Sequence, residues 1–203
     1  MAGILKCDQV QSDSNLSFQV AGANVAYMNS TGLQMTGGTL SLAGTTLIPA
    51  VGQIKFPATQ NASADANTLD DYEEGTWTPA LAVSVSGSIT MSTQEGVYTK
   101  IGQTVFFSCR FSTASISSPT GTITVTGLPF ASGSQTRFAC TIADMRSWGT
   151  AFTTPITATV EQSTTAITLT KQATNTGFSG VAGSDVSASS SANSMQIAGF
   201  YVI

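Results

Sequence analysis

Histidine is absent from this chain of 203 residues, and charged side chains are scarce. Without histidine there is no Ser–His or Cys–His nucleophile pair, no histidine-based zinc catalysis and no ordinary general base at neutral pH. Asp, Glu, Lys and Arg supply 9% of the residues, against roughly 25% in ordinary soluble domains. We therefore expect a protein that is not an enzyme and carries no cofactor.

Basic clusters and long apolar runs are missing as well. The seven Lys and Arg residues are scattered, and the net charge is −4. Phosphate binding needs clustered basic side chains, so we expect no nucleic-acid partner. No stretch approaches the ~20 apolar residues of a membrane span, which excludes membrane insertion by a helix. The start, MAGILKCDQVQSDSN, carries one Lys and no following apolar run, which predicts no secretory signal peptide.

The three cysteines are too few, and odd in number, for a disulfide framework. Cys109 and Cys140 lie in the apolar, strand-like runs FFSCRF and RFACTI. A small apolar side chain of this kind is often buried as a free thiol. We predict buried free thiols at these two positions rather than a bridge.

Ser, Thr, Gly, Ala and Asn are abundant, and a hydrophobic share of 41% is sufficient for a packed core. In residues 1–48, short alternating runs are separated by Gly- and Asn-containing turns; they lie at 16–20, 24–28, 32–36 and 39–43. Isolated hairpins of this length cannot bury their apolar faces alone. We predict an N-terminal β stem that trimerises and anchors the protein. Packing of these runs on the larger domain of the same chain is the alternative.

The predicted trimer and anchor interface consists of the apolar residues that alternate along these runs. They are Leu16, Phe18, Val20, Val25, Tyr27, Leu33, Met35, Leu40 and Leu42.

After a linker or junction over 49–75, residues 76–203 have the pattern of an all-β head. Strands are expected at 76–85, 88–92, 96–112, 121–128, 136–144, 156–162, 165–171 and 195–203, with a turn or bulge at Gly102. This spacing, without a long segment of helical period, predicts an antiparallel β-sandwich of jelly-roll type. The Gly- and Ser-rich stretch 173–194 is expected to be a surface loop. The apolar segment 195–203 is expected to pair within the sheet.

Three segments together resemble a known family: FPATQNASADANTLDDYEEGTWTP (56–79), GVYTKIGQTVFF (96–107) and MQIAGFYVI (195–203). They resemble the C-terminal knob of bacteriophage fibre and spike proteins, especially those of marine phages and cyanophages. The resembling part spans about residues 53–203, and the N-terminal runs are similar to the stem of such proteins. The resemblance implies a homotrimer with a stem and a β-sandwich head at the virion surface, made in the host cytoplasm.

The first of these segments concentrates four carboxylates, at Asp70, Asp71, Glu73 and Glu74. A glycosidase pair would need carboxylates on both sides of a sugar bond, which neighbours on one segment cannot provide. A second interpretation is an oxygen-ligand cation site, for which the candidate ligands are Asp65, Asn67, Asp70 and Asp71. The favoured interpretation is a solvated junction between stem and head. Its carboxylates would cap backbone donors or pair across subunits with Lys55, Lys100 or Arg137.

The two tryptophans are candidates for stacking on a sugar. Trp77 lies in the entry strand of the head, where core packing is the favoured interpretation. Trp148, in the Gly-containing segment DMRSWGTAF, is the candidate for an exposed ligand contact.

The length of the predicted stem indicates where on the virion the protein would lie. About 48 residues folded into hairpins extend only a few nanometres, since a strand rises roughly 3.3 Å per residue. This favours a capsid decoration or cement spike over a tail fibre or a distal receptor-binding adhesin; a polysaccharide-degrading tailspike is a third alternative. The expected partners are the chain itself, as a homotrimer, and the major capsid protein or another virion protein. A host surface glycan is an open alternative.

Overall fold

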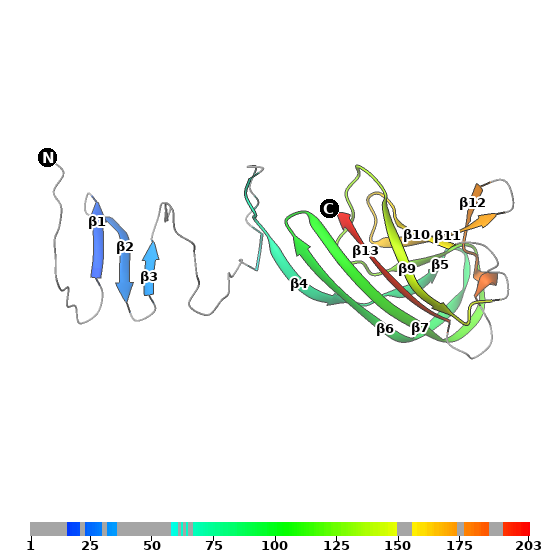
Figure 1. Cartoon of the computed structure of the whole chain (residues 1–203). Helices are drawn as coiled ribbons and strands as arrows, with labels where there is room; N and C mark the ends of the chain where they lie inside the picture. Colours follow the sequence, from blue (N-terminus) through cyan, green and yellow to red (C-terminus); the bar gives the residue numbers. More distant parts are fainter. Residues whose placement is uncertain are drawn as a thin grey trace. The chain divides into compact units, whose positions relative to one another are not determined.

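The structure is a computed structural model that describes part of the chain. The described residues are 16–20, 23–29, 32–35, 58–60, 62, 64, 67–149, 156–173, 177–186 and 193–203. The chain divides into two units, Met1–Ile54 and Lys55–Ile203, which are shown in Figure 1.

The described part of the first unit is a three-stranded antiparallel sheet. Its strands follow one another as β1 (Leu16–Val20), β2 (Ala23–Asn29) and β3 (Gly32–Met35). Alternating apolar residues separated by turn residues account for this up-and-down order. Three of the four predicted runs are therefore strands, while the fourth, 39–43, lies outside the described residues. Trimerisation of this stem stays a prediction.

The second unit contains one large antiparallel sheet. Its elements are β4 (Tyr72–Trp77), β5 (Ala80–Val83), β6 (Ser86–Ile101), β7 (Thr104–Thr120), β8 (Ile123–Thr126), β9 (Phe138–Arg146), β10 (Ile156–Val160), β11 (Ala166–Ala173), β12 (Gly177–Gly180), the 3₁₀ turn η1 (Gly183–Asp185) and β13 (Ser194–Val202). The strand order is β4-β6-β7-β13-β9-β10-β11-β8-β5, with β12 paired to β11.

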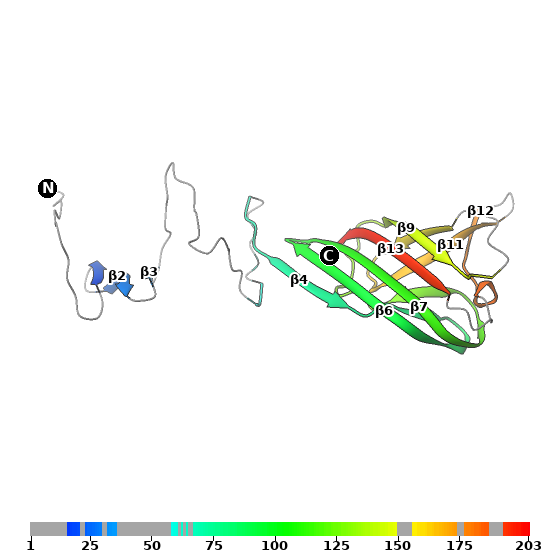
Figure 2. The ribbon, with the colours of Figure 1, turned by 60° about the horizontal axis from the view of Figure 1, so that its bottom comes forward.

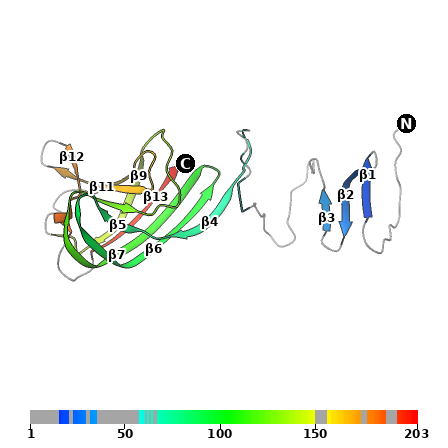
Figure 3. The same cartoon turned by 180° about the vertical axis from the view of Figure 1, so that it is seen from behind.

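The sheet is curled, because β4 and β5 lie at its opposite edges although only Thr78 and Pro79 separate them in the chain. Figures 2 and 3 show β6 and β7 on one side of the head and β11 on the other. The expected all-β, antiparallel sandwich-type fold is therefore confirmed. Prediction of a single strand over 76–85 was wrong, because Pro79 interrupts it and the two halves join different edges.

Alternation along the strands builds the core. On β7, Val105, Phe107, Cys109 and Phe111 are buried, while the residues between them face outward. β13 lies between β7 and β9, which Figure 1 shows, and its Ile197 and Tyr201 are fully enclosed. The expectation that 195–203 pairs within the sheet is confirmed.

The hairpin of β6 and β7 is the longest element of the head. Gly102 lies in its turn with φ of +56°, a conformation that glycine adopts at little cost, as predicted for this position. The structure differs from the prediction in β6, which runs unbroken over Ser86–Ile101. Two strands had been expected here, ending at residue 92 and beginning at residue 96. Shifts of register between Thr90 and Thr93 allow one strand to continue through this interval.

The stretch 173–194 was wrongly predicted as a surface loop in its described residues, which are 173, 177–186, 193 and 194. It contains β12 and η1, and Val181 is 1% exposed. Asp185 is buried; its carboxylate accepts hydrogen bonds from Lys171 Nζ at 2.6 Å and from the Ala182 N–H at 2.7 Å. The small polar residues of this stretch gave no sign of the ordered turn, which is held by the ion pair of Lys171 with Asp185 and by burial of Val181 and Val186.

Cys109 and Cys140 are both free thiols, as predicted; Cys109 is buried as expected, whereas Cys140 is only half-buried. Cys7 lies outside the described residues. Burial raises the pKa of Cys109 to about 12 and that of Cys140 to about 11. Both thiols therefore stay protonated in the folded head at neutral pH.

We expect Cys109 and Cys140 to resist alkylation while the head is folded. Shifts of this size lower the thiolate fraction by roughly 100-fold or more, and the thiolate is the reactive form. Iodoacetamide at pH 8 should modify both residues at least ~100-fold faster in concentrated urea than in buffer, followed by peptide mass spectrometry. Equal rates in the two solvents would contradict the observed burial.

Candidate functional site

The entry segment of the head, residues 70–77, is attached to the β6–β7 hairpin through Asp71. Its backbone carbonyl accepts a hydrogen bond from the Gly102 N–H at 2.9 Å. Its carboxylate forms an ion pair with Lys100 Nζ, and the two side chains are 9% and 3% exposed. The chain therefore enters the head at a fixed point, because main chain and side chain of one residue hold the same hairpin.

Lys100 is buried in surroundings that compensate its charge. Besides Asp71, its ammonium lies 5.7 Å from the centroid of the Phe130 ring. A cation at this distance from an aromatic face is attracted by the quadrupole of the ring. Removing either charge would leave the other buried without its partner, which is costly.

The next two carboxylates are held by phenols. Tyr98 Oη donates a hydrogen bond to Glu73, and Tyr72 Oη donates one to Glu74. The hydrogen bond to Glu73 raises the pKa of Tyr98 to about 12, and that to Glu74 raises the pKa of Tyr72. Both phenols therefore act as protonated donors at neutral pH. The carboxylates of this segment take part in structural contacts of the head.

The predicted pairing partners of these carboxylates fall in three different places. Lys100 meets Asp71 within one chain, so its predicted pairing across subunits is replaced by a contact inside the head. Arg137 instead pairs with Glu161 at 2.5 Å. Lys55 lies outside the described residues.

The candidate cation site is tested only in part. Asp65 lies outside the described residues, Asn67 is exposed and Asp70 is half-buried. The carboxylate of Asp71 is held by Lys100. Within the described ranges, no three acidic or cysteine side chains gather as metal ligands would. A cation at this segment stays a prediction.

Trp77 is a core residue, as predicted. It is 6% exposed and packs edge-on against Phe107, with ring centroids 6.1 Å apart. A side chain at Gly96 would meet the indole, since an added Cβ would lie 2.6 Å from its nitrogen. Gly96 therefore leaves the space that the buried indole of Trp77 occupies.

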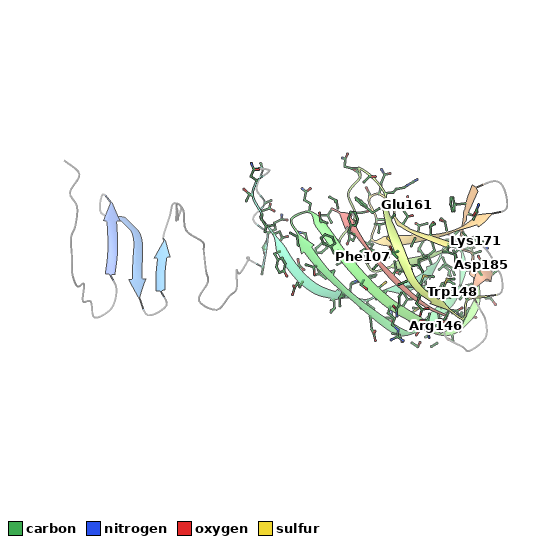
Figure 4. The ribbon with its side chains drawn as sticks, in the orientation of Figure 1. Phe107, Arg146, Trp148, Glu161, Lys171 and Asp185 are labelled. Carbon is green, nitrogen blue, oxygen red and sulfur yellow. The ribbon has the colours of Figure 1, made fainter. Side chains whose placement is uncertain are left out.

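Trp148 is half-buried, packs against the core and donates its indole N–H to the Ser194 carbonyl at 3.0 Å. Figure 4 shows it at the end of the head that also carries Lys171 and Asp185. This geometry gives Trp148 a packing role that was not anticipated. A ligand contact by Trp148 stays a prediction.

The outward face of the sheet carries a polar depression that the sequence did not reveal. It has a volume of about 370 Å³, and its lining includes Arg110, Asp144, Arg146 and Gln196. Arg146 Nε donates to Asp144 at 2.8 Å. These residues come from β7, β9 and β13, so only the strand order brings them together. The sequence signal was limited to charged residues at outward-facing positions of predicted strands.

The predicted trimer and anchor residues lie in the first unit. Seven of them are on the described strands: Leu16, Phe18 and Val20 on β1, Val25 and Tyr27 on β2, and Leu33 and Met35 on β3. Leu40 and Leu42 lie outside the described residues. The role of this set stays a prediction.

No known family model matches the chain, and no curated protein sequence does. Among solved structures, the chain is similar to the crystal structure of the Dettilon tailspike protein, with a TM-score of 0.55 and 25% identity. The match covers 64% of this chain and 24% of the tailspike chain. This likeness supports a structural or tail protein of a bacteriophage. In the described part of the chain, no helix is long and apolar enough to cross a membrane.

Proposed function

We propose that the protein is a non-enzymatic structural component of a bacteriophage virion. In this proposal it is a homotrimeric capsid decoration or cement spike, anchored by its N-terminal region to the major capsid protein or another virion protein. The head, from β4 to β13, is the outward knob. Shell subunits would be held together by burial of apolar faces and by pairing of strand edges in the anchor.

The observation that carries the virion assignment is the match of the curled antiparallel sheet to a phage tailspike over 64% of the chain. The chemistry of the sequence agrees with a mechanical role, since histidine is absent. The carboxylates of the entry segment are taken up by contacts within the head, with Lys100, Tyr98 and Tyr72. The capsid location is proposed from the short strands β1–β3, which suit a compact spike better than a long fibre.

A tail fibre or distal receptor-binding adhesin is the second candidate, and the tailspike neighbour favours it directly. The open polar depression beside Arg110 and Arg146 would then be the first place to look for a host glycan. Many weak contacts of this kind would add up through the number of copies. A polysaccharide-degrading tailspike is a more distant alternative, because the match covers only 24% of that chain.

Imaging of intact virions tests the proposal, with the protein tagged by an antibody fragment. We expect many copies on the head, at three-fold or quasi-three-fold positions of the shell. Virions assembled without the protein should then lose their genome at lower temperature and lower salt than complete virions.

A few copies at the tail would replace the cement assignment with that of an adhesin. Equal resistance of complete and depleted virions to heat would contradict the cement role even if the protein sits on the head. Soluble sugar released from a host polysaccharide by the purified protein would contradict the non-enzymatic assignment.

A further inference from the structure

The register of β4, β6, β7 and β13 places outward-facing residues in rows across four strands. The row nearest the hairpin turn consists of Tyr72, Ile101, Thr104 and Val202. The second row consists of Glu74, Thr99, Phe106 and Phe200. The third row consists of Thr76, Val97, Ser108 and Ala198. Large apolar side chains thus gather on one face of one half of the sheet.

These apolar side chains are exposed although most large apolar residues of the head are buried. Val97 is 57% exposed, Phe106 48% and Phe200 49%. Tyr72 and Ile101, directly opposite each other on β4 and β6, are 40% and 41% exposed. The rings of Phe106 and Phe200 lie side by side, with centroids 6.1 Å apart. We call these five residues the outer apolar patch.

The rows beyond this patch are polar and carry both signs of charge. The fourth row consists of Glu95, Arg110, Gln196 and Asp144. In the fifth row, Ser112 and Ser194 are followed by Arg146. Glu95 and Arg110 face each other across β6 and β7, yet within the described residues neither makes an ion pair.

We infer that the outer apolar patch and the charged rows beside it form a docking surface for a second copy of this chain. The head then contributes its own contacts between subunits, in addition to those predicted for the stem. This inference rests on the homotrimer of the proposed function, but not on whether the protein lies on the capsid or the tail.

Charge is the first argument for a copy of the same chain as the occupant. The flanking rows combine two carboxylates, Glu95 and Asp144, with two guanidinium groups, Arg110 and Arg146. A surface with both signs can meet copies of itself around a three-fold axis, since Arg110 of one copy can meet Glu95 or Asp144 of the next. A strongly acidic or strongly basic partner would meet repulsion from half of these groups.

Area is the second argument. The exposed apolar surface of the patch is on the order of 500 Å², at the upper end of what monomeric proteins leave uncovered. A standard interface buries about 800 Å² on each partner, with an apolar centre and a polar rim. The patch together with its charged flank has that composition. Two adjoining aromatic rings are also the kind of residue that dominates binding energy.

Thiol labelling of the full-length chain tests the docking surface. Val97→Cys places a thiol in the patch, and the control Val85→Cys places one at a position that is 74% exposed beyond β5. Both variants also carry Cys7→Ser, so that the new thiol is the readily reactive one beside buried Cys109 and half-buried Cys140. With a polar maleimide at micromolar protein concentration, we expect Val97→Cys to react at least ~10-fold more slowly than Val85→Cys.

Dissociation of the assembly tests whether a second copy is what covers the patch. The double variant Phe106→Ser/Phe200→Ser should dissociate at lower temperature than the parent protein, with the mass followed by light scattering. The control Phe178→Ser removes an aromatic side chain that is 66% exposed on β12, away from the patch. It should leave the dissociation temperature unchanged.

Each outcome of the two measurements is decisive. Fast labelling at position 97 in an assembled protein overturns the inference and leaves the homotrimer of the proposed function standing. Slow labelling in a protein with the mass of one chain means that residues of the same chain cover the patch, and overturns both. Slow labelling with no change of dissociation temperature in the double variant also assigns the cover to the same chain, and overturns the inference alone.

Discussion

Replacing Asp71 with Asn should lower the free energy of unfolding of the head by about 3–5 kcal/mol. The substitution keeps the size of the side chain but leaves the ammonium of Lys100, which is 2% exposed, without its counter-charge. Among the described residues, the ring of Phe130, 5.7 Å from the ammonium, would be left to compensate the charge. Urea unfolding followed by tryptophan fluorescence measures the change, because Trp77 lies in the core.

Two further variants separate the charge from the shape of the site. The double variant Asp71→Asn/Lys100→Met should recover most of the loss, because it removes both buried charges together. Glu74→Gln, three residues after Asp71, should change stability by less than about 1 kcal/mol, since Glu74 is exposed. A double variant as unstable as Asp71→Asn alone would show that packing, rather than the buried charge, dominates.

Ala198→Pro should be the most disruptive single change in the outward row of β13. Ala198 pairs with Ser108 of β7 and with Thr141 of β9, so its N–H is part of a ladder in the middle of the sheet. Proline removes this donor and is found almost only in edge strands or bulges. We expect a loss of about 3 kcal/mol or more in the free energy of unfolding.

The matched control is Ala198→Ser, which keeps the N–H and nearly the size of the side chain. It should cost less than about 1 kcal/mol in the same urea titration. If the proline variant unfolded at the same urea concentration as the serine variant, β13 could not be the central strand that the structure assigns.

The strands of the head were largely predictable, because buried residues alternate along them with period two. Phe107, Cys109 and Phe111 on β7 show this pattern plainly. The order of the strands was not predictable, since nothing local says that β13 pairs between β7 and β9. The break at Pro79 was missed in the predicted strand 76–85, and nothing local says that its two pieces join opposite edges of the sheet.

For the candidate sites too, the residue types were predictable from the sequence, but their arrangement in space was not. Concentration of carboxylates at Asp70–Glu74 was visible in the sequence. Lys100 was one of three predicted partners, but the pairing was expected across subunits rather than within the chain. That the pair would be buried depended on the position of Phe130, which is 30 residues further along the chain. The outer rows from Tyr72 to Arg146 were invisible, because residues in one row come from strands far apart in the sequence.

The central position of β13 has a consequence for the synthesis of the protein. All other strands of the head leave the ribosome before β13, which joins β4-β6-β7 to β9-β10-β11-β8-β5. Until β13 is available, β7 and β9 each present an unpaired edge beside an apolar face. Incomplete heads thus expose unpaired strand edges, and edges of this kind promote aggregation. The sheet of the head is therefore completed only when β13 has been synthesised and has paired with both β7 and β9.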